Sequence, residues 1–204
     1  MLITFEGIDG CGKSTQLQLL KQRLADHGVQ VSSFREPGGT ELSESVRSLL
    51  LDIKNTMHPV TELLLFSAAR SELIASVVQP RLEAGEVVLL DRFYDSTVAY
   101  QGYGRQSLAI ERIRELNRVA AHGLEPEVTF YFKISIEEAE RRRAGTEKDR
   151  MEDSGRQFYE EVIRGFDELA ESEQRVKLIQ AQQSVDQIHE EVWNTVSAKL
   201  KNRG

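Results

Sequence analysis

Residues 7–15 read GIDGCGKST and match the phosphate-loop pattern G-x-x-x-x-G-K-[ST], with glycine at both required positions. The apolar run Leu2–Phe5 precedes this stretch, and an amphipathic segment, Gln16–Leu24, follows it. A strand, a glycine-rich turn and a helix in this order form the setting in which the pattern binds phosphate. We therefore favour phosphate binding over the alternative of a glycine-rich turn that happens to contain a lysine.

The residue types in this stretch suit a nucleoside triphosphate. Glycine lets backbone N–H groups curl around phosphate oxygens, and the helix that follows turns its positive end toward the anion. Lys13 can reach the outer phosphates, and the Ser14 hydroxyl can ligate Mg²⁺. We interpret Cys11 as a small filler and not as a nucleophile. The candidate ATP-binding residues are Gly7, Ile8, Asp9, Gly10, Cys11, Gly12, Lys13, Ser14 and Thr15.

The composition indicates a soluble, globular chain. Its 204 residues are 40% apolar and 29% charged, which suits one α/β domain over residues 1–204. Without a run of about 18 apolar residues or a basic, apolar leader, we expect no membrane span, no secretory signal and a cytoplasmic location. A single cysteine forbids an intrachain disulfide and suits a reducing compartment. The net charge of −7 argues against a broad nucleic-acid-binding face.

The order of the expected elements predicts a three-layer α/β fold of the P-loop NTPase type. We expect strands at 2–6, 29–35, 87–90, 128–133 and 176–180, and helices at 13–26, 41–51, 59–84, 95–103, 107–121, 136–143, 158–171 and 184–200, the third with a bend near Pro80. Strands and helices that alternate through short connections predict a five-stranded parallel sheet with helices on both faces. Ligands bind beyond the carboxyl ends of such strands, where residues 7–15, Glu36 and Asp91 fall.

Charged residues follow two of these strands. Asp91 ends an apolar strand, where it can hold Mg²⁺ directly or through water, although it could instead cap the next helix. Arg92 comes next and can bind a second anion with both arms of its guanidinium, the alternative being a surface ion pair. Glu36 could accept a hydrogen bond from a substrate hydroxyl or hold a metal-bound water, but a plain turn explains it equally well.

Two further groups of residues are candidates. Phe66 and Arg70 lie four apart on one helical face and could grip a nucleobase, although an aromatic at helical spacing also suits the core. Arg141, Arg142, Arg143 and Arg150 flank a charged segment, residues 144–155, with almost no apolar residues. Such an arm can close over transferring phosphates, or it can be a solvated helix end. Three consecutive arginines cannot all face one way, so at most two reach the cleft.

At four places the chain resembles the thymidylate kinases of bacteria, and the resemblance covers nearly its whole length. The matching segments are FEGIDG at 5–10, REPGGT at 35–40, LFSAAR at 65–70 and DRFYDSTVAYQG at 91–102. The first motif alone indicates only a phosphate-loop protein, whereas the four together are specific. The resemblance implies transfer of the γ-phosphate of ATP to dTMP, giving dTDP and ADP for dTTP synthesis.

The resemblance also implies roles for individual residues. Phe66 would stack on thymine, Arg70 would bond a carbonyl of the base, and Arg92 would hold the phosphate of the acceptor. Thr97 and Gln101 would lie near the base edge, and Tyr100 would lie against the sugar where a 2′-hydroxyl would protrude. Asp9 and Glu36 would lie near the sugar and phosphate. Lys13, Mg²⁺ held by Ser14 and Asp91, and arginines of the arm would spread the charge of the moving phosphoryl group.

Some thymidylate kinases carry a catalytic arginine in the phosphate loop, where this chain has Gly10. The chain resembles the other branch, in which a mobile lid, here around 141–155, supplies the cation. The segment EKDR at 147–150 supports this, and we select Arg141, Arg143 and Arg150 as lid candidates. The resemblance further implies a homodimer, for which the long helix after Pro59 offers an apolar face.

Two alternatives remain open from the sequence. One is another small-molecule kinase of the same fold, such as a deoxynucleoside or adenylate kinase. The pair Phe66 and Arg70 and the pair Thr97 and Gln101 argue against it. The other is a nucleotide-binding switch that hydrolyses slowly and signals through its shape. The dense arginine arm and the second anion site favour an enzyme.

Overall fold

The computed structural model describes residues 1–145, 150–151 and 154–201. Its five strands form one parallel sheet in the order β2-β3-β1-β4-β5. The bounds are β1 (Leu2–Glu6), β2 (Val31–Arg35), β3 (Val87–Asp91), β4 (Val128–Lys133) and β5 (Val176–Gln180). The predicted five-stranded parallel sheet is therefore confirmed.

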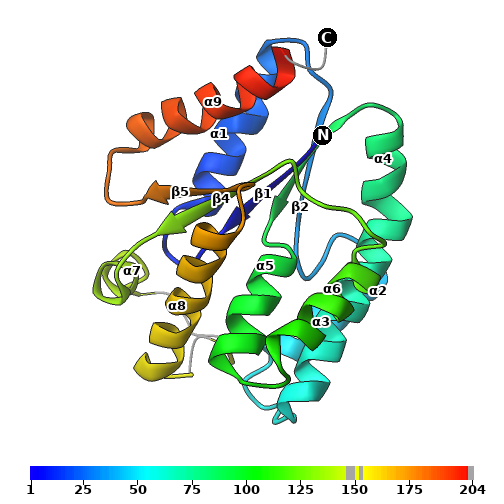
Figure 1. Ribbon diagram of the computed structural model, residues 1–204, viewed down its shortest axis with the longest axis vertical. Helices are drawn as coiled ribbons and strands as arrows, with labels where there is room; N and C mark the ends of the chain where they lie inside the picture. The colour runs from blue at the N-terminus through cyan, green and yellow to red at the C-terminus, as the bar shows by residue number, and fades with distance from the viewer. Residues whose placement is uncertain (146–149, 152–153, 202–204) are drawn as a thin grey trace.

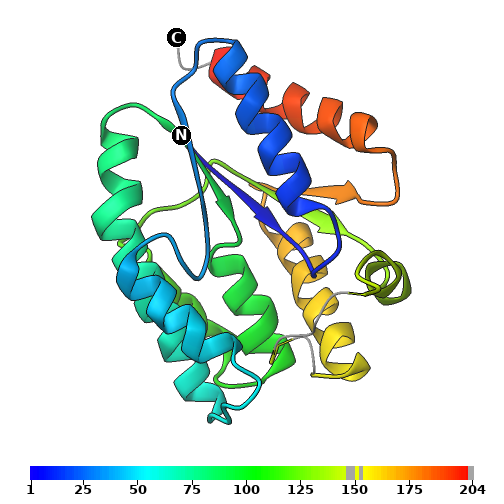
Figure 2. The same cartoon turned by 180° about the vertical axis from the view of Figure 1, so that it is seen from behind.

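Helices cover both faces of this sheet (Figures 1 and 2). Helices α1 (Lys13–Asp26) and α9 (Val185–Lys201) lie on one face, and α5 (Tyr94–Thr97) and α8 (Arg156–Ser172) lie on the other, beside a group formed by α2, α3 and α6. The remaining helices are α2 (Glu41–Leu51), α3 (Pro59–Leu73), α4 (Gln79–Glu83), α6 (Ile110–Ala120) and α7 (Ile136–Arg142), with π-helical turns at η1 (Ile74–Val78) and η2 (Val98–Gly104).

The core forms where apolar strand faces meet the apolar stripes of the helices. On one face, Leu17, Leu20 and Leu24 of α1 are buried, and on the other Phe166 stacks on Tyr131 of β4. Strands β1, β3 and β4 are buried on both faces, as expected of central parallel strands. This packing fixes the carboxyl ends of neighbouring strands along one edge of the sheet, where the site lies.

Several boundaries differ by one to three residues from those expected, such as the start of α6 at Ile110 instead of residue 107, and two departures have a clear physical reason. Strand β2 begins at Val31 and not at residue 29, because the Val29 N–H still closes the end of α1 by donating to the Leu24 carbonyl, with Gly28 at a φ of 74°. The long third helix does run on past Pro80, but its irregularity is the π turn at Ile74–Val78. Pro80 has no N–H to donate to the preceding turn, and η1 occupies that turn.

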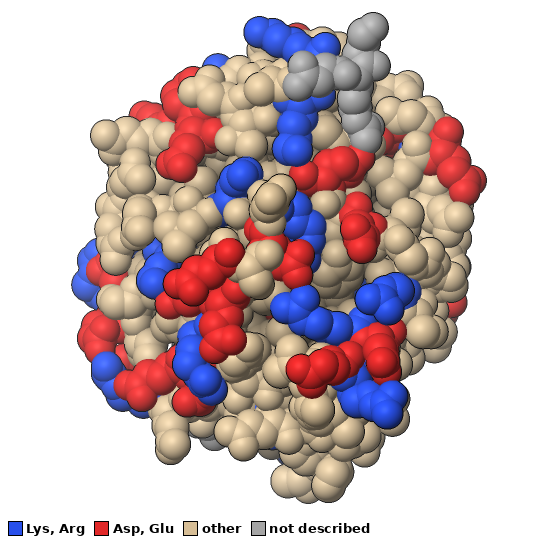
Figure 3. Space-filling view, viewed as in Figure 1, with Lys and Arg blue, Asp and Glu red and all other residues tan. Residues whose placement is uncertain are grey.

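The surface mixes charges of both signs. Acidic and basic side chains are interspersed over the face seen in Figure 3. No described helix combines the length and apolar character needed to cross a membrane.

Candidate active site

The phosphate loop lies between β1 and α1. Gly7, Gly10 and Gly12 all have positive φ angles, of 135°, 86° and 97°, which lets the chain curl tightly before the helix begins. A Cβ on Gly10 would stand 2.7 Å from the Ala139 carbonyl oxygen, so position 10 has no room for a side chain here. The Lys13 ammonium is buried and donates to the carbonyls of Gly7 (3.0 Å) and Ile8 (3.1 Å), which holds it over the loop.

The two predicted metal ligands meet at the same end of the sheet. Ser14 Oγ donates to Asp91 Oδ2 over 2.6 Å, and Asp91 does not cap α5, whose N-cap residue is Phe93. In the part of the chain that the structure describes, no three His, Cys, Asp or Glu side chains are grouped to hold a metal ion. A hydroxyl and one carboxylate nevertheless suit Mg²⁺, which usually keeps several waters and binds phosphate oxygens as well.

A cavity surrounds the loop and extends toward α7 and α9. Seven consecutive residues of the loop and α1, Gly10 to Gln16, line it together with Asp9 and Asp91. On its far side it is lined by Arg142, Ala181, Gln183, Val185 and Ile188. Cys11 is buried, in keeping with a packing role.

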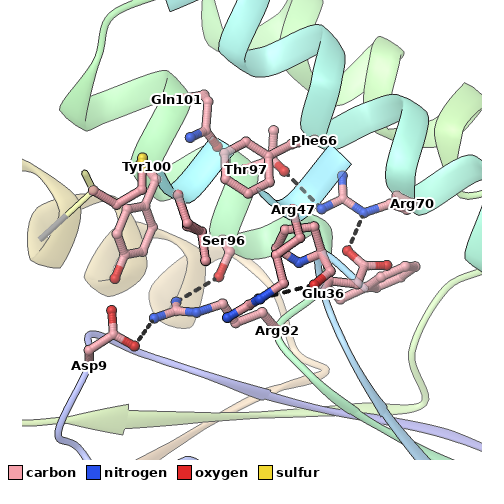
Figure 4. Close-up of a pocket in the computed structure, with 14 residues that line it drawn as sticks. Asp9, Glu36, Arg47, Phe66, Arg70, Arg92, Ser96, Thr97, Tyr100 and Gln101 are labelled. Atoms are coloured by element: carbon pink, nitrogen blue, oxygen red, sulfur yellow. Dashed lines mark hydrogen bonds and ion pairs between the residues drawn. The ribbon is translucent and has the colours of Figure 1, made fainter. Parts of the chain in front are cut away.

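A second cavity adjoins the first and shares Asp9 with it (Figure 4). All eight residues predicted to bind the acceptor line this pocket, namely Asp9, Glu36, Phe66, Arg70, Arg92, Thr97, Tyr100 and Gln101. We call it the acceptor pocket. It is also lined by residues that the sequence did not single out, namely Pro37, Arg47, Leu51, Phe93, Ser96 and Met151.

Arg92 lines the acceptor pocket and contacts Asp9, the residue that the two cavities share. Its backbone is left-handed, with a φ of 70°, and its guanidinium donates to the Gly7 carbonyl (3.0 Å), to Ser96 Oγ (3.1 Å) and to Asp9 Oδ1 (2.7 Å). Figure 4 shows the side chain reaching from Ser96 to Asp9. Burial alone would raise the pKa of Asp9, but the charges of Arg92 and Lys13 hold it well below its usual range.

A buried carboxyl group lies behind Arg92 and is linked to it through Ser96. Glu6, the last residue of β1, accepts hydrogen bonds from Ser96 Oγ (2.6 Å) and from the Phe93 N–H (2.7 Å). Burial, reinforced by the nearby charge of Asp95, raises the pKa of Glu6 to about 8. The sequence analysis did not select Glu6, although an acid at the end of a strand beside a phosphate loop is a usable signal.

Arg70 is held rigidly on the opposite side of the acceptor pocket. Its guanidinium donates to Glu36 Oε2 (2.7 Å), to Asn117 Oδ1 (3.1 Å) and to Thr97 Oγ1 (2.9 Å). The other Glu36 oxygen, Oε1, is buried and has no hydrogen-bond partner among the described residues. Burial raises the pKa of Glu36 although Arg70 opposes the shift. This pair leaves a carboxylate oxygen available to a ligand.

Comparison with known proteins agrees with this geometry. Residues 5–192 match the family model described as thymidylate kinase. The chain belongs to the thymidylate kinase family. It is 46% identical to the thymidylate kinase of Prosthecochloris aestuarii, over 98% of this chain and 94% of that one, and 46% identical to that of Chlorobium luteolum over the full length of both. The crystal structure of thymidylate kinase from Ehrlichia chaffeensis superposes with a TM-score of 0.79 at 36% identity, covering 97% of this chain and 98% of that one.

Membership of the thymidylate kinase family confirms the P-loop NTPase fold and decides between the alternatives left open by the sequence. The chain is a phosphate-transferring enzyme and not a nucleotide switch, and the relatives named above are thymidylate kinases. The roles of the individual residues stay predictions.

The arginines expected in the thymidylate kinase lid have different surroundings. Arg141 is 73% exposed and binds Glu138 with two nitrogens (both 2.7 Å). Arg142, which the sequence analysis passed over, lines the loop cavity and donates to Glu138 (2.8 Å) and to the Ala181 carbonyl (2.9 Å). The side chain of Arg143 lies next to Gly10.

The remaining lid arginine, Arg150, is docked away from the loop cavity. It donates to the Leu50 carbonyl (2.7 Å) and forms an ion pair with Glu62 (2.7 Å). Within the predicted lid, the motif residues 147–149 lie outside the described residues.

Proposed function

We propose that this chain transfers the γ-phosphate of ATP to dTMP, giving dTDP and ADP, as a step in dTTP synthesis. The observation that carries the proposal is that two cavities meet at Asp9, one around the phosphate loop and one lined by all the predicted acceptor residues, with Arg92 bound to Asp9 on the acceptor side. A donor phosphate on the loop and an acceptor phosphate on Arg92 would meet there. Family membership supports the same reaction.

The residues of the acceptor pocket can contact the base, the sugar and the phosphate of dTMP. Phe66 stacks on the base, and Arg70 has N–H groups beyond its three bonds that can donate to a base carbonyl. Thr97 and Gln101 lie near the base edge, and the Tyr100 ring fills the space that a 2′-hydroxyl would need. Arg92 binds the acceptor phosphate, and the unpaired oxygen of Glu36 accepts from a hydroxyl of the sugar.

The phosphate loop binds ATP through its backbone N–H groups and through Lys13. Ser14 and Asp91 would hold Mg²⁺, because their oxygens complete a set with phosphates and waters. When bound, such an ion neutralises charge on the phosphate oxygens.

Transfer needs positioning and positive charge more than a strong base, because the acceptor is already a phosphate oxyanion. Arg92 aligns the attacking oxygen, and Lys13 stabilises charge on the phosphoryl group as it moves. The arginines of the lid supply the rest of the charge and exclude water, which would otherwise compete as acceptor. Arg141 and Arg143 are candidates from the sequence, Arg142 is added by its place at the loop cavity, and Arg150 would have to leave Glu62 to take part.

We propose that the chain works as a homodimer. Leu64 on α3 is 52% exposed, and Leu42 and Leu49 on the adjacent α2 are also exposed. Light scattering at micromolar concentration is expected to give twice the 23.1 kDa chain mass, and a monomer would contradict this. The cytoplasmic location expected from the sequence stays a prediction.

A coupled ADP-release assay with ATP and Mg²⁺ tests the reaction. The acceptors are dTMP, dUMP, dCMP, AMP, thymidine and none. We expect rapid turnover with dTMP and weaker turnover with dUMP. Turnover that prefers another acceptor would refute the assigned base pocket, and slow hydrolysis independent of acceptor would refute the transfer itself.

A further inference from the structure

Glu62 of α3 is a buried carboxylate that joins three segments of the chain. The residue is 1% exposed. Its Oε1 accepts from Gln101 Nε2 (3.0 Å) and from Arg105 Nε (3.3 Å), and its Oε2 forms an ion pair with Arg150 (2.7 Å). Glu62 itself is not among the residues that line the acceptor pocket, so any effect on the substrate must pass through a neighbour.

The neighbour that does line the pocket is Gln101. A carboxylate with three donors directed at it acts as an acceptor, so the Gln101 amide must present its nitrogen to Glu62. The amide oxygen of Gln101 then points away from Glu62, where it can accept from a donor in the acceptor pocket. Without such a constraint, a glutamine amide could turn over and exchange its donor for its acceptor.

We propose that Glu62 sets the base specificity of the acceptor pocket by fixing the orientation of the Gln101 amide. The proposal deepens the proposed function and rests on it. With its nitrogen held by Glu62, Gln101 offers an acceptor to the base edge. Thymine and uracil carry an N3–H that can donate to this oxygen. Cytosine has an unprotonated N3, which would face the oxygen lone pairs and leave both acceptors unpaired.

The specificity follows from which hydrogen bonds can form. A polar site that matches one substrate rejects an analogue that leaves its buried groups unpaired. Arg70, a donor only, adds a second barrier to cytosine, whose exocyclic amine also donates. Glu62 therefore controls one of two barriers against cytosine and has no part in reading the 5-methyl group that separates thymine from uracil. That distinction provides an internal control.

The test is the substitution Glu62→Gln, measured as kcat/KM for dTMP, dUMP and dCMP. The amide that this substitution introduces can turn its NH₂ toward Gln101, which frees Gln101 to present its own nitrogen to cytosine N3. We expect the dTMP:dCMP ratio to fall by at least about tenfold, while the dTMP:dUMP ratio changes by less than about twofold. A folded variant with an unchanged dTMP:dCMP ratio overturns the proposal, as does an equal loss of both ratios, which would indicate general loosening of the pocket.

Two further variants keep the test decisive. The double variant Gln101→Ala, Glu62→Gln is expected to have the same dTMP:dCMP ratio as the single variant Gln101→Ala, because the side chain that Glu62 orients is absent from both. A further fall there would overturn the proposal. Should Glu62→Gln fail to fold, Glu62→Asp keeps the charge for Arg105 and Arg150 but draws it back from Gln101. A lowered ratio supports the proposal, and an unchanged ratio overturns it.

The wild-type enzyme separates this proposal from the proposed function. If the wild type does not phosphorylate dTMP, the function itself is refuted. If it does, and the Glu62 variants leave the base preference intact, only the role of Glu62 is refuted.

Discussion

The phosphate loop and the acceptor pocket lie side by side but are built on different principles. The loop is a run of consecutive residues whose three glycines take up positive φ angles, and Lys13 is its main side-chain contributor. The acceptor pocket takes its side chains from the phosphate loop, from the segments that follow β2 and β3, and from α2, α3, α5 and η2, and it holds them by hydrogen bonds among polar groups. The loop should therefore tolerate changes that keep its backbone, whereas a change in the pocket should propagate to its neighbours.

The largest effect is expected for Lys13, whose substitution tests most directly whether the loop depends on one side chain and otherwise on its backbone. Lys13→Ala should lower kcat by about 10²- to 10³-fold, because it removes one donor aimed at developing charge. Cys11→Ala, in the same loop, is the matched control and should leave kcat close to that of the wild type, since the backbone N–H remains. Steady-state kinetics with circular dichroism measures both. An active Lys13→Ala enzyme, or an equal loss in Cys11→Ala, would contradict the division between backbone and side chain.

Arg92→Ala should raise the KM for dTMP roughly 10- to 100-fold, because a hydrogen bond to a charged group contributes about 1.5–3 kcal/mol to binding. The KM for ATP should change much less, because Arg92 does not line the loop cavity. Arg92→Lys keeps the charge but cannot reach Gly7, Ser96 and Asp9 together, so it should recover only part of the loss. Equal losses for both substrates would show that the two sites are not separable.

The same division explains what could be predicted from the sequence. The strands and the phosphate loop follow from local pattern, because apolar runs and glycine spacing act within a few residues. The acceptor residues came from resemblance to a family, since no spacing rule brings Glu36, Phe66 and Gln101 together. The sequence analysis missed Glu62, although the apolar run LLLF directly after it in a helix is a usable signal. An acid next to such a run can be buried, and a buried acid needs a partner.

The lid shows where pattern is insufficient. Arg141, Arg142 and Arg143 are consecutive, and the sequence established only that they cannot all face one way. The end of α7 decides which one reaches the loop cavity, because a helix turns about 100° per residue and this one ends at Arg142. The Arg142 side chain is held there by its bond to the Ala181 carbonyl, 39 residues away in the sequence, which no local pattern predicts.

A smaller effect on kcat is expected for the two neighbouring arginines at the end of α7, Arg141 and Arg142. Arg142→Ala should lower kcat by about 3- to 10-fold, since partly exposed charged hydrogen bonds contribute roughly 0.7–1.4 kcal/mol. Arg141→Ala should lower it less, because its guanidinium is exposed and bound to Glu138. Single-turnover rates with saturating dTMP measure the difference. A larger loss in Arg141→Ala would mean that the lid rearranges before transfer.

The last prediction concerns stability and not rate: the titration of Glu6 makes the free energy of unfolding depend on pH, and the sign of this dependence can be derived. The pKa of Glu6 is about 8 in the folded protein, raised from 4.5 by burial and Asp95. Between these values the folded state holds a proton that the unfolded state has lost, so the free energy of unfolding should fall as pH rises. One proton corresponds to at most about 1.4 kcal/mol per pH unit.

Glu6→Gln imitates the protonated carboxyl, since its amide can still accept from the Phe93 N–H and can donate to Ser96. Urea unfolding at pH 6, 7 and 8 should therefore show a shallower decline in the variant, the two proteins differing by about 1–2 kcal/mol over that range. Parallel declines would place the titrating group elsewhere. Because Ser96 also bonds Arg92, a variant with a flat stability profile and an altered KM for dTMP would show that the buried carboxyl of β1 reaches the acceptor phosphate through two hydrogen bonds.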